Sequence, residues 1–298
     1  MAREEAHRPV LLDEVCDILR PAARGCYLDC TVGAGGHAER ILALSQPDGK
    51  LIGIDRDPQA LAAAARRLGR FGKRVSLVHA NFTDAAGVLT DHGIGSVHGI
   101  VFDLGLSSLQ LDAPDRGFSF RHGEAPLDMR ADPTTGHTAA ELIARASERQ
   151  LADVLWEYGD ERRARRIARA VCRARRREPI RTAGQLAAVV ERAAGGRRGR
   201  IHPATRTFMA VRVWTNRELP NLEQALTSVR DLVRPGGRVV VISFHSKEDR
   251  IAKTVFRAQA REGVWELLTR RPVVPTADER RANPRARSAK LRAVERKA

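Results

Sequence analysis

The sequence predicts an α/β fold with a mostly parallel sheet, interrupted by an all-helical insertion. In the first third of the chain, short apolar runs alternate with amphipathic or alanine-rich stretches, which is typical of βαβ units. No strand is evident between about residues 111 and 214, and the alternation resumes afterwards. The expected divisions are a first α/β part at 1–111, a helical insertion at 112–214 and a second α/β part with a basic tail at 215–298.

Each of the four apolar runs in the first part leads into a polar residue. The runs are Cys26–Leu28, Leu51–Ile54, Val75–Val78 and Ile100–Phe102, and the residues that follow them include Asp29, Asp55, Asn81 and Asp103. Open parallel sheets bind ligands in the crevice at the carboxyl ends of their strands. One such acid is commonly a helix cap, whereas four polar ends in register favour a binding site.

The insertion begins with a loop over 112–137 and continues with helices near 138–144, 148–156, 161–176 and 182–194. In 161–176, an apolar stripe lies opposite an arginine stripe. The second part predicts a helix at 219–233, a Pro-Gly-Gly turn at 235–237, a buried strand at 239–243 and a helix at 249–260. Two short strand candidates, 264–268 and 289–294, close the chain.

The chain is strongly basic, with 52 Lys and Arg against 36 Asp and Glu and a net charge of +16. Residues 161–200 hold fourteen arginines and three acids, and residues 280–298 hold eight basic residues and one acid. Such segments favour a polyanion partner, here a nucleic acid. The alternative interpretation is a solvated helix face.

Other classes of protein are disfavoured. The charged stretch 1–9 has no apolar run behind it, and the longest aliphatic run, 239–242, is far too short to span a membrane. The cysteines contain no C-x-x-C pair, so we expect reduced thiols in a cytoplasmic protein and no metal site.

The loop after the first strand is rich in glycine and opens a helix. Its pattern, Gly33-x-Gly35-x-x-Ala38, also fits a dinucleotide fingerprint. Asp29 distinguishes a dinucleotide site from a site for S-adenosylmethionine, because a carboxylate beside the helix N-terminus would repel a pyrophosphate. It would instead bind the ammonium of S-adenosylmethionine. Asp55, 22 residues after Gly33, lies where an acid contacts ribose hydroxyls, and Phe82 could flank the adenine.

The chain resembles the bacterial small-subunit ribosomal RNA cytosine-N4 methyltransferases over nearly its whole length. The motifs that carry the resemblance are 7–14, the glycine loop through His37, 53–58, 103–108 with Gln110, 116–120, 126–130, 202–208, 243–246 and 283–288. Lys247, directly after the 243–246 motif, stands where the resemblance leads us to expect a leucine.

The resemblance implies a Rossmann-like class I S-adenosylmethionine methyltransferase. Its expected substrate is the exocyclic N4 of a decoding-centre (P-site) cytidine in 16S rRNA of the small ribosomal subunit. The cofactor contacts implied by the matching motifs are Gly35, Gly36, His37, Asp55, Phe82, Asp103 and Gln110. The residues themselves add Asp29 and Gly33 to this set.

Two residues are candidates for the chemistry. The N4 amine is a poor nucleophile, so it must be oriented and must lose a proton. Asp103 is the first candidate for this role, with a purely cofactor-binding role as the equal alternative. His245, just past the fifth strand, could face the base or could only pack.

Residues assigned to RNA lie in the matched motifs and on the insertion. His202, Arg206, Arg212 and Asn216 recur at about one or two helical turns, which could line one surface. The full expected set is Ser107, Ser108, Arg116, Arg166, Arg169, Arg173, His202, Arg206, Arg212 and Asn216.

Two further hypotheses compete with the methyltransferase. A non-catalytic rRNA-binding assembly factor could keep the fold, but the intact Asp29, Gly33 and Asp55 argue against a decayed site. A nicotinamide-dependent oxidoreductase is disfavoured by Asp29 and by the arginine load. The sequence is also compatible with a homodimer.

Overall fold

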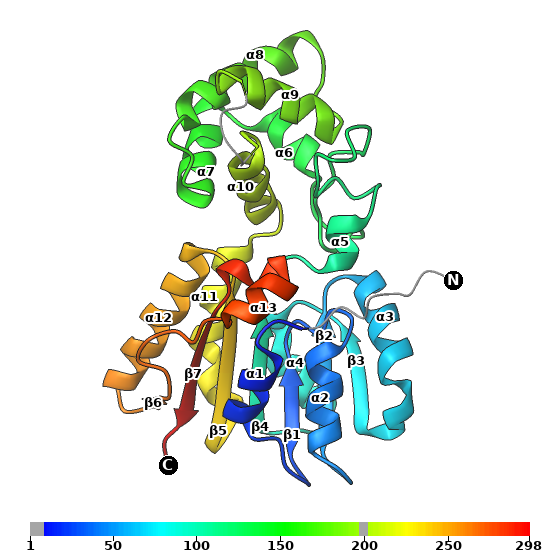
Figure 1. The fold of residues 1–298 in the computed structure, drawn as a ribbon, viewed down its shortest axis with the longest axis vertical. Coiled ribbons are helices and arrows are strands. Elements are labelled where there is room, and N and C mark those ends of the chain that lie inside the picture. The colour runs from blue at the N-terminus through cyan, green and yellow to red at the C-terminus, as the bar shows by residue number, and fades with distance from the viewer. Residues whose placement is uncertain (1–8, 197–201) are drawn as a thin grey trace. The chain divides into compact units, whose positions relative to one another are not determined.

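The computed structural model describes residues 9–196 and 202–298 (Figure 1). The chain divides into two compact units. The first unit comprises Met1–Ser107 and Leu219–Ala298, and the second comprises Ser108–Glu218. The divisions predicted after residues 111 and 214 each lie four residues from these boundaries.

The first unit is built on a seven-stranded sheet in the order β3-β2-β1-β4-β5-β7-β6. Its strands are β1 Cys26–Asp29, β2 Lys50–Asp55, β3 Val75–His79, β4 Val97–Asp103, β5 Val233–Ser243, β6 Trp265–Leu267 and β7 Lys290–Arg296. Strands β1 to β5 pair in parallel, while β7 pairs antiparallel with β5 and β6. The predicted mostly parallel α/β sheet is thus confirmed. The order turns back between β1 and β4, which places the topological switch point there.

Apolar clusters cover both faces of this sheet. Along β4, Ile100 and Phe102 belong to one cluster and Val101 to the other, as the two-residue period of a strand requires. The helices of this unit are α1 Leu12–Leu19, α2 Gly36–Leu44, α3 Pro58–Leu68, α4 Ala85–Asp91, α11 Glu218–Ser228, α12 Ser246–Arg261 and α13 Ala277–Ala282. Since both faces are covered by helices, the strands read as continuous apolar runs.

The second part of this unit departs from the sequence prediction near Pro235. The helix expected to reach residue 233 ends at Ser228, and the expected turn lies inside β5. Pairing with β4 moves from Val97↔Val233 to Gly99↔Arg238, so extra residues of β5 loop out between the two pairs. A proline lacks the N–H needed for the ladder, which explains why the Pro-Gly-Gly motif forms this bulge rather than a separate turn.

The second unit is helical in its described residues. Its helices are α5 Ser108–Asp112, α6 Ala139–Arg145, α7 Glu148–Gly159, α8 Ala164–Arg177, α9 Ala183–Ala193 and α10 Thr205–Thr215. Capping boxes built on Thr138 and Thr182 begin α6 and α9. The apolar stripe of α8, including Ile167 and Val171, is buried.

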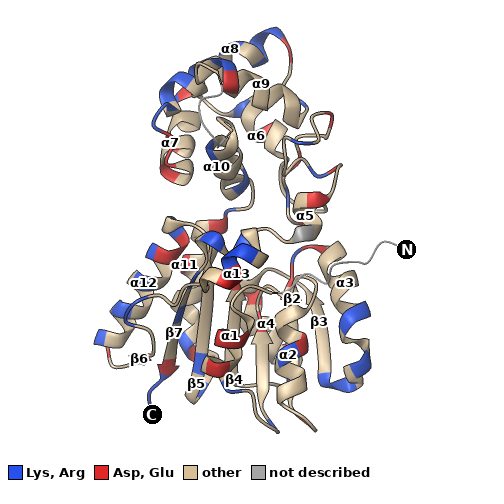
Figure 2. Ribbon diagram, viewed as in Figure 1, with Lys and Arg blue, Asp and Glu red and all other residues tan. Residues whose placement is uncertain are grey.

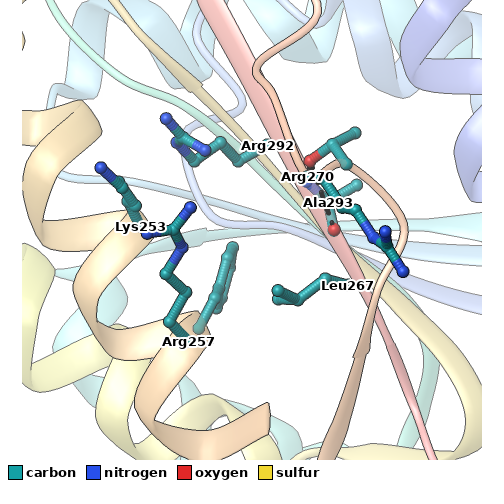
Figure 3. Close-up of a pocket in the computed structure, with 8 residues that line it drawn as sticks. Lys253, Arg257, Leu267, Arg270, Arg292 and Ala293 are labelled. Carbon is teal, nitrogen blue, oxygen red and sulfur yellow. Dashed lines mark hydrogen bonds between the residues drawn. The ribbon is translucent and has the colours of Figure 1, made fainter.

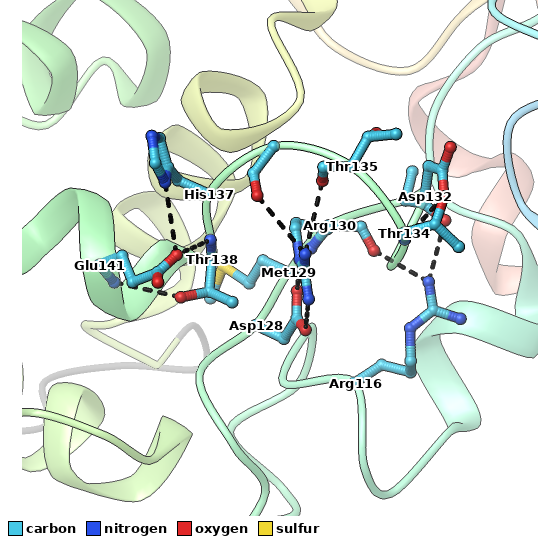
Figure 4. Close-up of polar contacts among 12 residues, drawn as sticks. Arg116, Asp128, Met129, Arg130, Asp132, Thr134, Thr135, His137, Thr138 and Glu141 are labelled. Carbon is cyan, nitrogen blue, oxygen red and sulfur yellow. Dashed lines mark hydrogen bonds and ion pairs between the residues drawn. The ribbon is translucent and has the colours of Figure 1, made fainter.

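The long loop before α6 is ordered by buried polar contacts (Figure 4). One guanidinium nitrogen of Arg116 donates to the carbonyl oxygens of Arg130, at 2.8 Å, and Ala131, at 3.0 Å. The guanidinium of Arg130 forms an ion pair with Asp128 at 2.8 Å. The hydrogen bonds of Arg116 satisfy backbone carbonyl groups that would otherwise be orphaned in a segment without strands or helices.

None of the helices in the described part of the chain combines the length and the apolar character needed to cross a bilayer.

Candidate cofactor site and basic surfaces

Three of the predicted strand-end acids lie together at the carboxyl edge of the sheet. Asp29 ends β1, Asp55 ends β2 and Asp103 ends β4, and β1 is paired with both of the other strands. Because β1 and β4 flank the switch point, this edge is where an open α/β sheet forms its ligand crevice.

The glycine loop joins β1 to α2 at the same edge. Gly35 precedes the helix with φ +82°, and no side chain caps the helix there. A Cβ on Gly35 would lie 3.2 Å from the side chain of Leu68, so both conformation and space favour glycine. The first N–H groups of α2 are therefore free of a side-chain cap and suited to an anionic group.

The carboxylate of Asp29 is buried directly beneath this loop. Its side chain accepts a hydrogen bond from the Thr31 N–H at 3.1 Å, and the residue is 1% exposed. Burial raises the pKa of Asp29 to about 7, although His37 and the Thr31 N–H oppose the shift. A positively charged ligand would relieve this cost.

His37 and Asp103 complete a cluster of unsatisfied buried polar atoms. His37 Nε2 lies 3.5 Å from Asp103 Oδ2, too far for a strong hydrogen bond. Neither ring nitrogen of His37 nor Asp103 Oδ1 has a hydrogen-bond partner among the described residues. Burial lowers the pKa of His37, but Asp103 and Asp29 outweigh it and raise that pKa. Buried groups left unpaired in this way indicate a site that a polar ligand completes.

The donor set suits the amino-acid end of S-adenosylmethionine. Asp29 offers a buried acceptor for the ammonium, and the start of α2 offers donors for the carboxylate. No phosphate is needed to satisfy these groups. The residues present therefore fit the predicted cofactor.

Asp55, which is predicted to contact the ribose hydroxyls, also holds the glycine loop in place. Its two carboxylate oxygens accept from the Gly33 N–H and the Asp57 N–H, each at 2.9 Å. Burial raises its pKa, while these two hydrogen bonds oppose the shift. Phe82 follows β3, and its ring contacts the edge of Phe102 with centroids 5.7 Å apart. The ribose and adenine contacts stay predictions.

Sequence reasoning missed Thr31. Its hydroxyl oxygen accepts from the Asp103 N–H at 2.6 Å and so ties the end of β4 to the loop after β1. The signal lay in its place between Asp29 and Gly33, but a threonine there has no fixed partner until β1 and β4 are known to be neighbours.

The predicted contact of Gln110 with the cofactor and those of Ser107 and Ser108 with RNA stay predictions. Gln110 is buried on α5 in the second unit. Ser107 is partly exposed at the end of the first unit, and the side chain of Ser108 lies outside the described residues.

His245 forms the N-cap of α12. Its Nδ1 accepts from the Glu248 N–H at 3.4 Å, and its Nε2 lies 3.0 Å from Glu248 Oε1. The Glu248 carboxylate in turn accepts from the Phe244 N–H at 2.8 Å. Through this capping box His245 fixes the start of α12. Its expected catalytic role stays a prediction.

The arginines of α8 give the second unit a basic surface (Figure 2). Arg166, Arg169 and Arg173 are exposed, and among the described residues only Arg169 has an acidic partner, Glu148 at 3.4 Å. On α10, Arg206 is exposed and donates to the Asp160 carbonyl. His202 precedes α10 and stacks on Phe120 with centroids 4.4 Å apart.

Three residues predicted to contact RNA are buried or paired within the protein. Arg116 is 5% exposed and bonded to loop carbonyls, so it orders the loop. Asn216 is 8% exposed, and its amide bonds to the backbone of Met129, Ala131 and Arg212. Arg212 is half-buried and paired with Glu218 at 2.9 Å. The structure thus gives Arg116 and Asn216 contacts within the protein, and their expected contacts with RNA stay predictions.

A second basic cluster lies where α12 faces β6 and β7 (Figure 3). Lys253, Arg257 and Arg270 line a cavity of about 10 Å³, which holds no more than about one water. This cavity is too small for a ligand.

Comparison with known proteins gives consistent results. The model of the MraW methylase family matches residues 4–297. A Ribosomal RNA small subunit methyltransferase H from Symbiobacterium thermophilum is 48% identical, with 97% of this chain and 96% of that protein aligned. The protein of the same name from Dehalococcoides mccartyi is 47% identical over 98% of this chain and 87% of its own length. A solved rRNA methylase from Streptococcus thermophilus aligns with 96% of this chain and 94% of its own chain, with 11% identity and a TM-score of 0.44.

Proposed function

This chain belongs to the MraW methylase family, and from that premise we propose that it methylates the exocyclic N4 of the decoding-centre (P-site) cytidine in 16S rRNA. The protein is an S-adenosylmethionine-dependent rRNA methyltransferase, and its substrate is the RNA of the small ribosomal subunit in the cytoplasm. The observation that carries this proposal is the cluster of Asp29, His37 and Asp103. The buried carboxylate of Asp29 suits a cationic cofactor, and the unpaired atoms of His37 and Asp103 suit further polar ligand groups.

The residues of the first unit would hold the cofactor. When bound, S-adenosylmethionine supplies an electrophilic methyl group. The N–H groups at the start of α2 would receive its carboxylate, and Asp29 its ammonium. Asp55, already bonded to the loop, has remaining lone pairs for the ribose hydroxyls.

Asp103 is the residue proposed to act on the amine. Its Oδ2 faces His37, whereas its Oδ1 has no hydrogen-bond partner among the described residues. The partly exposed Asp103 carboxylate would accept an N4 hydrogen, align the lone pair with the methyl group and take up the proton as the nitrogen–carbon bond forms.

Arginine-rich surfaces support the choice of substrate. A cytosine in structured RNA must be unstacked before it reaches such a crevice, which costs a few kcal/mol. Exposed Arg166, Arg169 and Arg173 would offset this cost through phosphate contacts.

Incubation with tritiated S-adenosylmethionine and naked 16S rRNA, small subunits or whole ribosomes tests the proposal. We expect label in N4-methylcytidine from at least one substrate, and none with Asp103→Asn, which should still bind the cofactor. Another labelled nucleoside would keep the enzyme class and reject the target. Failure to label any of the three substrates, with RNA binding intact, would favour a non-catalytic assembly factor.

A further inference from the structure

A pocket of about 270 Å³ lies at the carboxyl end of β5. Its walls come from the segment after β5 and from α13 with the short 3-10 segment Pro284–Ser288 before β7. All of its lining residues belong to the first unit. None of them was assigned to the cofactor. His245 was a candidate for the chemistry, and Arg280, Arg287 and Lys290 belong to the basic segment 280–298 that favours a nucleic-acid partner.

The lining of the pocket is cationic. Its charged residues are Arg280, Arg287 and Lys290, its hydroxyl groups come from Ser246 and Ser288, and no acid among the described residues lines it. Arg280 and Arg287 are exposed, and neither side chain makes a hydrogen bond or ion pair among the described residues. Two unpaired guanidinium groups beside hydroxyl donors suit an oxyanion with several acceptor oxygens.

Nearby acids do not neutralise this pocket. Asp249 lies 3.6 Å from Lys290, but its other contact is Arg292 at 2.6 Å, and these cations lower its pKa despite its burial. Glu248 is 3% exposed and accepts backbone N–H groups. The positive charge of the two arginines is therefore left for a ligand.

The wall that carries the arginines is held in place. Glu279 on α13 accepts from the Leu11 N–H at 2.8 Å, and Asn283 caps the following 3-10 turn by accepting from the Arg285 N–H at 3.1 Å. Val273 and Leu291 exchange backbone hydrogen bonds beneath it. A preorganised wall reduces the ordering cost of binding.

The pocket adjoins the proposed reaction site. Strand β5 is the direct neighbour of β4, with Ile242 paired to Asp103. Phe244, which lines the pocket, packs against the loop after Asp103, because a Cβ on Gly105 would lie 3.2 Å from its ring. Adjacent strands are about 4.8 Å apart, so pocket and Asp103 lie within the span of one or two nucleotides.

We propose that this pocket binds a backbone phosphodiester of the RNA strand next to the target nucleotide, through Arg280 and Arg287. This inference rests on the proposed function. The volume of about 270 Å³ leaves room for a sugar beside the phosphate. Exposed Val274 and the ring of Phe244 supply an apolar surface for that sugar.

The experiment compares two double variants of the full chain. Arg280→Ala with Arg287→Ala removes both pocket arginines, and Arg257→Ala with Arg270→Ala removes the same charge from the small cluster on the other side of α12. Binding of a single-stranded RNA that spans the target site is measured over a salt series. The pocket variant should bind about tenfold more weakly, with a salt slope shallower by about 0.7, the value for one phosphate. The control variant should lose less than about twofold, and both should keep their cofactor affinity.

Inorganic phosphate distinguishes the two sources of the anion. At matched ionic strength it should compete only weakly with the RNA. Equal RNA affinity for both double variants would overturn the inference, and so would tight binding of inorganic phosphate with RNA binding unchanged. Methyl transfer by the unaltered chain is measured alongside. If it fails, the proposed function fails, whereas the RNA comparison still decides the role of the pocket.

Discussion

At the scale of single residues, the buried carboxylate of Asp29 should make cofactor binding depend on pH. Burial raises its pKa to about 7, and the ligand ammonium needs the ionised form. Affinity should therefore fall as the pH drops below 7, by up to about tenfold per pH unit. Protonation of His37, whose pKa is also raised, acts in the same direction.

Calorimetry between about pH 5.5 and 7 measures this dependence, because a carboxylate with a pKa near 7 becomes progressively protonated over this range. In Asp29→Asn the affinity should be weak and the part of the dependence due to this carboxylate lost. An unaltered chain whose affinity is flat over this range would contradict the assigned role of Asp29.

Asp55→Ala should weaken S-adenosylmethionine binding by at least about tenfold, because it removes hydrogen bonds to a charged acceptor and releases the Gly33 N–H. Asp48→Ala is the matched control, since that acid lies in an exposed loop and contacts Arg24. Calorimetric affinities for both variants decide the matter. The role of Asp55 would be rejected if the two variants bound equally well.

Single residues differed in how far the sequence could assign them. Asp29, Asp55 and Asp103 stood out because each directly follows an apolar run that predicts a strand. Asn216 was assigned to RNA from its helical spacing with His202, Arg206 and Arg212, and Arg116 because it lies in a matched motif. Their partners include carbonyl and N–H groups 14 to 87 residues away in the chain, which no local pattern reveals.

At the scale of elements, α8 is the helix whose charge should matter most for RNA. Changing Arg166, Arg169 and Arg173 to Glu should reduce RNA affinity at least about tenfold while sparing cofactor affinity, because like charges then face the phosphates. Arg250→Glu, Arg257→Glu and Arg261→Glu on α12 make the same change of net charge on exposed positions of the first unit. Filter binding at low and moderate salt compares the two triple variants. Equal losses would mean that net charge, not α8, governs binding.

Not every arginine of α8 is available for RNA. The guanidinium of Arg175 donates to the carbonyls of Ile143 and Ala146, and that of Arg163 donates to the Ala194 carbonyl. The sequence identified the arginine stripe through its helical period, but which arginines cap neighbouring helices depends on how α6, α8 and α9 pack.

His245 should stabilise α12 through its cap. His245→Ala should lower the free energy of unfolding by about 1 kcal/mol, and His245→Asn should restore most of it because asparagine caps well. Chemical denaturation gives these values, and methyl transfer is measured in parallel. Activity that tracks stability supports positioning, whereas a stable but inactive Asn variant would assign the imidazole to the chemistry.

Most helices were predicted from apolar periods, and their ends shifted by a few residues. The larger error concerned residues 229–237. A Pro-Gly-Gly sequence ordinarily marks a turn between elements, but here β4 pairs on both sides of it and keeps it inside β5. Only the neighbouring strand decides whether such a motif ends a strand or forms a bulge within it.

At the scale of the whole molecule, the net charge of +16 predicts that RNA binding and cofactor binding respond differently to salt. The logarithm of RNA affinity should fall linearly with the logarithm of salt concentration, at about 0.7 per phosphate contacted on a single strand. Cofactor affinity should change little, because its charges are buried and screened weakly. Titrations of one preparation with both ligands over the same salt series test this, and parallel slopes would contradict it.

The sequence by itself determined the α/β class, the helical insertion, the family and the strand-end acids, because these follow from local period, composition and motif. The tertiary structure decided which of those acids share a crevice, since only the strand order brings Asp29 and Asp103 to one switch point. It also separated structural from available basic residues, leaving Arg116 within a loop and Arg280 and Arg287 in an open pocket. Burial and pairing are properties of distant segments brought together, so no single stretch of sequence encodes them.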